Sequence, residues 1–110
     1  MSGLLDPDVL EMLVEVIGDD AARGVIALFL EECTDLTATI AAPGADHVAI
    51  GRAAHSLKSS AGQLGAVALS EAALAVETAA GAAATELPAL IAALGQCAAE
   101  TRQALAAKLR

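Results

Sequence analysis

The chain has 110 residues, 56% of them hydrophobic, and Phe29 is its only aromatic residue. This length suits one small domain, which we expect to span residues 1–110. The formal net charge of −8 argues against a nucleic-acid partner, because neutralising phosphates requires clustered lysines and arginines. No run of 18 or more residues lacks polar groups, so we expect no membrane span. The first eight residues do not resemble a secretory leader, and we expect a cytoplasmic protein.

Helix start and stop signals divide the chain into five segments, and apolar residues recur at helical spacing in each of them. The first helix is expected from Asp6–Pro7 to Gly18, the second from Asp19 or Asp20 to Pro43–Gly44, and the third from Asp46 to Gly65. The fourth is expected from Val67 to Ala80, with the break beginning at Gly81. The fifth is expected to begin at a Thr85 cap, and its apolar stripe continues to Leu109. The strong helix formers alanine and leucine dominate the apolar content. We therefore predict an all-α fold, an antiparallel up-and-down four-helix bundle with a short extra N-terminal helix that caps one end.

The third expected helix carries a histidine on its outer face. Its apolar stripe is Ile50, Ala54, Leu57, Ala61 and Leu64. At 100° per residue, His55 lies roughly 160° from Leu57 and therefore faces outward. The side of His55 also carries Gly51, Arg52, Lys58, Ser59 and Gly62. Each glycine destabilises a helix by roughly 0.5–1 kcal/mol relative to alanine, which indicates that another backbone comes close there. The two cations, one turn away on either side, can stabilise added negative charge.

This stretch resembles the phosphoacceptor motif of histidine-containing phosphotransfer (HPt) domains, approximately H-x-L-K-G-x-[SA]-x-x-L-G. The matching residues are His55, Leu57, Lys58, Ala61, Leu64 and Gly65. Ser59 stands where the family usually has glycine. The chain length and the five-segment layout are also similar, so the resemblance covers essentially the whole chain.

The resemblance implies that His55 is phosphorylated on Nε2 and that a Glu or Gln 22 residues further on, here Glu77, holds Nδ1. Lys58 is expected to shield the phosphoryl oxygens and Arg52 to contribute more weakly. Gly51, Ser59 and Gly62 are expected to leave clearance for a docking partner.

The implied role is that of a phosphocarrier in a two-component phosphorelay, not of an enzyme. The chain has no Gly-rich nucleotide loop and no carboxylate cluster suited to Mg²⁺. The resemblance implies that the receiver domain of a response regulator or hybrid histidine kinase supplies the aspartate and the Mg²⁺. We expect this chain to bind no cofactor or metal and to be a monomer.

Two other functions compete with this one. A di-metal carboxylate bundle would need inward-facing Glu-x-x-His pairs, which the chain lacks. A bundle that docks a receiver or kinase as a non-phosphorylated adaptor stays open, because docking and chemistry share a surface. His47 is expected to be an ordinary surface residue, and Cys33 and Cys97 small core thiols.

Overall fold

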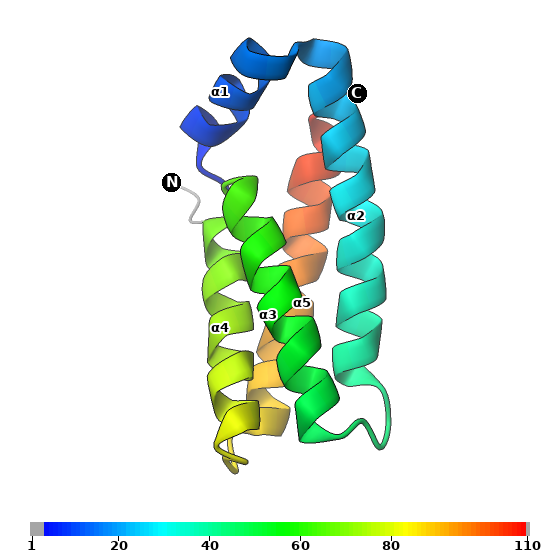
Figure 1. Ribbon diagram of the computed structural model, residues 1–110, viewed down its shortest axis with the longest axis vertical. Coiled ribbons are helices and arrows are strands. Elements are labelled where there is room, and N and C mark those ends of the chain that lie inside the picture. The colour runs from blue at the N-terminus through cyan, green and yellow to red at the C-terminus, as the bar shows by residue number, and fades with distance from the viewer. Residues whose placement is uncertain (1–3, 110) are drawn as a thin grey trace.

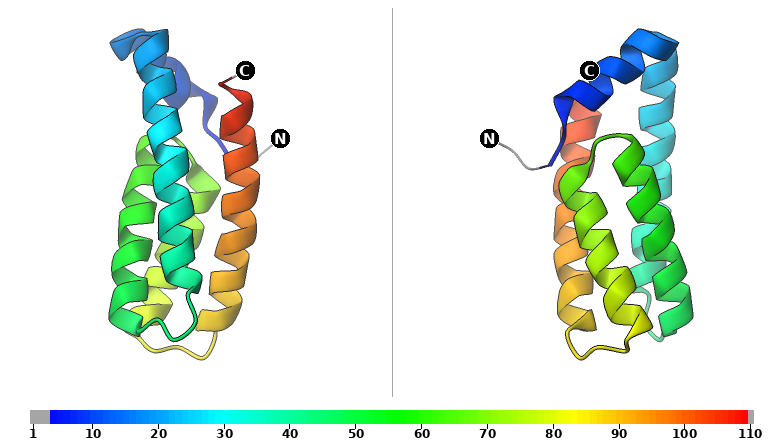
Figure 2. Two further views of the ribbon diagram at one scale, coloured as in Figure 1. Left: turned by 90° about the vertical axis from the view of Figure 1, so that its right-hand side faces the viewer. Right: turned by 60° about the vertical axis from the view of Figure 1, so that its left-hand side comes forward.

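The computed structural model describes residues 4–109, which form five α-helices joined by short connections (Figure 1). The helices are α1 (Pro7–Ile17), α2 (Asp19–Ala41), α3 (His47–Gln63), α4 (Val67–Gly81) and α5 (Leu87–Ala107). Figures 1 and 2 show α2 to α5 running side by side and alternating in direction, while α1 leans across one end. The predicted four-helix bundle with a short N-terminal helix is confirmed. Among the described residues, no helix is long and apolar enough to span a membrane.

Aliphatic side chains fill the interior of the bundle. The stripe expected on α3 is buried, and Ala54, Leu57 and Ala61 are closed to solvent. Across from it, α4 contributes Leu69 and Ala73, which are equally buried. The α3–α4 pair is the most extensive of the helix pairs, because alanines along their seam allow the two helices to approach closely. This seam positions the site described below.

The two cysteines are free thiols on α2 and α5. Cys33 is fully buried, as expected for a core thiol, whereas Cys97 is half-buried. Burial raises the pKa of both thiols, which disfavours the reactive thiolate.

A glycine turn joins α3 to α4. The Ala66 N–H donates to the Ala61 carbonyl at 2.8 Å, which is the long hydrogen bond of a Schellman motif. Gly65 stops α3 as predicted, with a φ of +74° that favours glycine. The Asp6 N–H donates to the Gly65 carbonyl at 2.8 Å, and a Cβ on Gly65 would lie 2.8 Å from the Cβ of Val9. The start of α1 therefore packs against this turn.

The end of α4 uses the same motif without a glycine. The Ala84 N–H donates to the Ala79 carbonyl at 2.9 Å, and Ala83 takes the left-handed position with a φ of +50°. Gly81, where the break was expected to begin, is instead the last helical residue. The strained position of this turn therefore falls on an alanine.

The prediction that Thr85 caps the fifth helix is wrong. Glu86 precedes α5 with φ −75° and ψ −8°, and no side chain makes a cap hydrogen bond there. A side-chain N-cap requires an extended backbone, whereas here the chain enters the helix through a turn in which the Leu87 N–H donates to the Ala84 carbonyl at 3.1 Å.

Candidate functional site

His55 lies near the middle of α3, opposite its buried stripe. Asp46 starts this helix by accepting a hydrogen bond from the Ala49 N–H at 2.7 Å. Leu57 is completely buried, whereas 59% of the His55 side chain is exposed. The imidazole can therefore meet another molecule without any movement of α3.

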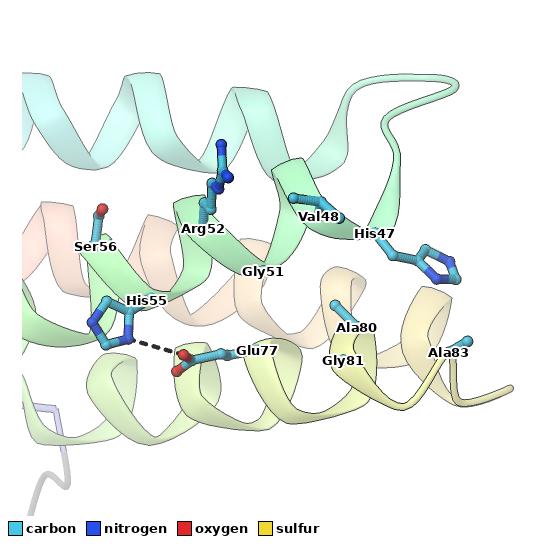
Figure 3. A pocket seen from close by; sticks show the side chains of 10 residues that line it. All are labelled: His47, Val48, Gly51, Arg52, His55, Ser56, Glu77, Ala80, Gly81 and Ala83. Atoms are coloured by element: carbon cyan, nitrogen blue, oxygen red, sulfur yellow. Dashed lines mark hydrogen bonds and ion pairs between the residues drawn. The ribbon is translucent and has the colours of Figure 1, made fainter.

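Glu77 of α4 faces His55 across the seam (Figure 3). Its Oε2 lies 2.9 Å from His55 Nδ1, and its Oε1 lies 3.1 Å from Nζ of Lys58. The Lys58 ammonium lowers the pKa of the Glu77 carboxyl most, partial desolvation opposes this effect, and His55 lowers the pKa further. The carboxyl is therefore ionised at neutral pH and holds a histidine with one oxygen and a lysine with the other.

This contact determines which ring nitrogen of His55 is available for chemistry. An ionised carboxylate can only accept hydrogen bonds, so Nδ1 carries the proton and donates to Glu77. Nε2 of the neutral imidazole then keeps its lone pair. Figure 3 shows the Nε2 edge turned away from Glu77, toward the later turns of α3. The ring is thus held by one edge and open at the other.

The two cations expected beside His55 are placed differently from each other. Lys58 contacts Glu77, and 29% of its side chain is exposed. Arg52 is exposed, and Figure 3 shows its side chain leading away from the His55–Glu77 pair. Of these two cations, the structure thus brings only Lys58 to the pair, through its contact with Glu77. The shielding roles of both cations stay predictions.

The glycines on the His55 side of α3 face α4. A Cβ on Gly51 would lie 3.9 Å from Ala80 Cβ, and one on Gly62 would lie 3.6 Å from Ser70 Oγ. Both are ordinary van der Waals distances to side-chain atoms of α4, so alanine would fit at either position. Ser59 is exposed on the same helix. The clearance role of these three residues stays a prediction.

His55 forms part of the wall of a groove between the first half of α3 and the end of α4. The groove is lined by His47, Val48, Gly51, Arg52, His55, Ser56, Glu77, Ala80, Gly81 and Ala83 (Figure 3). His47 is exposed, as expected, but it shares this groove with His55. The sequence predicts that His47 and His55 share a face, because residues 47, 51 and 55 are four positions apart and therefore lie on one side of the helix. The sequence does not predict which residues of α4 line the groove, because this depends on how the two helices are aligned.

The donor set of the site does not fit a resident metal. Within residues 4–109, no group of three or more histidine, cysteine, aspartate or glutamate side chains could hold a metal ion. What the site offers is an exposed imidazole whose Nδ1 contacts a carboxylate that also holds Lys58.

Comparisons with known proteins identify the family of the chain. The family model of the Hpt domain matches residues 24–107, a range that includes His55 and Glu77. The crystal structure of histidine-containing phosphotransfer protein B (HptB) from Pseudomonas aeruginosa PAO1 is similar with a TM-score of 0.91 and 25% sequence identity. This similarity covers 99% of the present chain and 96% of that chain. A search of curated protein sequences gave no significant match. The chain therefore belongs to the Hpt domain family and is a histidine phosphotransfer protein of a phosphorelay.

Proposed function

We propose that His55 is the phosphoacceptor of this chain. Its Nε2 takes a phosphoryl group from the aspartate of a receiver domain, or from a kinase, and passes it to a response regulator. The observation that carries this proposal is the 2.9 Å contact between Nδ1 and the Glu77 carboxylate, which leaves Nε2 as the free nitrogen of an exposed ring. Glu77 is proposed to orient the ring.

No proton needs to leave the site during the proposed transfer. The Nε2 lone pair attacks phosphorus, and the N–P bond forms as the P–O bond to the donor aspartate breaks in line with it. The aspartate leaves as a carboxylate. Because Nδ1 keeps its proton, the phosphorylated ring carries a positive charge next to the Glu77 carboxylate. Glu77 thus stabilises a positive charge that is created by the transfer, and the Glu77 carboxylate is in place before the transfer begins.

Lys58 is proposed to change partners during the transfer. Its ammonium lies 3.1 Å from Glu77 in the unphosphorylated protein. Once the ring is cationic, Glu77 faces two positive charges, while the phosphoryl oxygens offer Lys58 a new negative partner. Lys58 then shields the phosphoryl group, with a weaker contribution from the exposed Arg52.

The docking partner is proposed to supply the remaining groups that the transfer needs. A receiver domain would supply the aspartate together with Mg²⁺, and this chain would bind no cofactor of its own. Gly51, Ser59 and Gly62 would leave room for the receiver beside His55. The cytoplasmic location and the monomeric state stay predictions.

The test uses phosphoramidate, a small-molecule phosphoryl donor that needs no partner protein. The chain has two histidines, and both line the same groove, so His47→Gln is a matched control for His55→Gln. We expect wild type and His47→Gln to gain one acid-labile, base-stable phosphoryl group, and His55→Gln to gain none. Wild-type labelling of His55→Gln would overturn the assignment. A folded wild-type protein that takes no label would favour the adaptor function.

A further inference from the structure

The hydroxyl of Ser59 has no hydrogen-bond partner within residues 4–109. Most other hydroxyls on the neighbouring helices are occupied. Three threonines of α2 donate to carbonyls of their own helix, namely Thr34, Thr37 and Thr39. Ser70 of α4 donates to the Lys58 carbonyl at 3.0 Å. Ser59 makes no bond of either kind, although it is exposed on α3 one turn beyond His55.

The spacing along the helix places Ser59 next to the Nε2 edge of His55. Residues four apart on a helix have Cβ atoms about 5–6 Å apart, and side chains lean toward the helix N-terminus. Ser59 therefore leans back toward His55, whose Nε2 edge is turned toward the later turns of α3 (Figure 3). Ser56, the immediate neighbour of His55, leads away from the Glu77 contact in the same view.

Within residues 4–109, the Nε2 of His55 has no hydrogen-bond partner. Lys58 is engaged by Glu77 on the Nδ1 side, 3.1 Å from Oε1, and Arg52 leads away from the pair. Ser59 is therefore a donor near His55 that is already free to meet oxygens attached to Nε2, whereas Lys58 must first leave Glu77.

We propose that the Ser59 hydroxyl donates a hydrogen bond to a phosphoryl oxygen on His55 Nε2 and prolongs the lifetime of the phosphohistidine. This inference rests on the proposed function, because the phosphoryl group is the one assigned to His55. Breaking the N–P bond passes through a loose, metaphosphate-like state in which electron density moves from the phosphoryl oxygens toward phosphorus. A donor that holds charge on these oxygens favours the intact bond. A hydrogen bond to a charged group in an exposed site corresponds to about a 3- to 10-fold change in lifetime.

The test compares Ser59→Ala with wild type after phosphorylation by phosphoramidate and removal of the donor. The half-life of the phosphohistidine should fall about 3- to 10-fold, and its ³¹P resonance should move. Ser59→Thr keeps the hydroxyl and should restore both. The control is Ser60→Ala, which removes a half-buried hydroxyl from a groove between α2 and α3 that does not include His55.

The outcomes separate this inference from the proposed function. If phosphoramidate labels His55 but Ser59→Ala keeps the wild-type half-life and resonance, Ser59 does not bind the phosphoryl group and the function stands. An equal effect of Ser60→Ala, or failure of Ser59→Thr to restore the half-life, also overturns the role of Ser59. Absence of any label on His55 refutes both proposals.

Discussion

Removing the charge of Glu77 is the sharpest perturbation of the proposed chemistry. Glu77→Gln keeps an oxygen that can accept from Nδ1 but no longer offers a negative charge to the phosphorylated ring. Two unit charges about 4 Å apart interact by about 1 kcal/mol in water and about 4 kcal/mol near a protein surface. Because 59% of the His55 side chain and 29% of the Glu77 side chain are exposed, the lower part of this range applies. A loss of about 1–2 kcal/mol corresponds to about a 5- to 30-fold slower phosphorylation.

The assay is the initial rate of phosphorylation by phosphoramidate, followed by ³¹P NMR or intact mass. Glu77→Ala, which removes the acceptor as well, should react no faster than Glu77→Gln. Glu71→Gln is the control, because Glu71 is exposed on the same helix and its substitution changes the net charge equally. If Glu77→Gln reacts as fast as Glu71→Gln, Glu77 does not stabilise the cationic ring and the reasoning fails.

Four further predictions concern the scaffold and its docking face. Ala83→Gly should stabilise the protein by about 0.5–1 kcal/mol in thermal unfolding, because glycine accepts a φ of +50° without strain; an unchanged or lower midpoint would contradict this. Gly65→Ala should destabilise it by about 2–3 kcal/mol in urea, because it combines a left-handed φ with the 2.8 Å approach to Val9; a loss below about 1 kcal/mol would contradict the close packing. Gly51→Ala should leave the rate of labelling by phosphoramidate unchanged and raise the free energy of unfolding by about 0.5–1 kcal/mol. Because Gly51 is proposed to leave room for the receiver, the same substitution should slow transfer from a phosphorylated receiver. An unchanged transfer rate would contradict the clearance role of Gly51. Finally, the lowered pKa of Glu77 stabilises the fold above its ordinary value of 4.5 and ceases to do so as the pH falls through the lowered value. The stability difference between wild type and Glu77→Gln should therefore be constant near neutral pH and shrink below about 4.5; a difference that grows in acid would contradict the sign.

The helix boundaries could be predicted where the chain signals them locally. Asp6 and Asp46 accept cap hydrogen bonds, and Gly65 adopts the left-handed conformation at the end of α3, each as its residue type indicates. The connection from α4 to α5 could not be predicted in this way. Its left-handed residue is Ala83, and no rule of residue preference selects an alanine for that conformation.

The candidate site was predictable in its residues and less so in their contacts. The outward direction of His55 follows from helical periodicity, and the offset to Glu77 came from the family resemblance. The contact of Lys58 with Glu77 cannot be predicted from the sequence, because it depends on the alignment of α3 and α4. The same alignment decides which end of α4 shares the groove with His47. Periodicity within one helix does not contain this information.

The His55–Glu77 contact joins residues only 22 positions apart across one tight turn. In terms of folding kinetics, such a local contact requires little loop-closure entropy, so the α3–α4 hairpin can assemble its reactive pair early. In terms of sequence divergence, α1, α2 and α5 contribute no atom to this pair. Their outer surfaces can therefore change in sequence while the imidazole of His55 and the carboxylate of Glu77 keep their geometry.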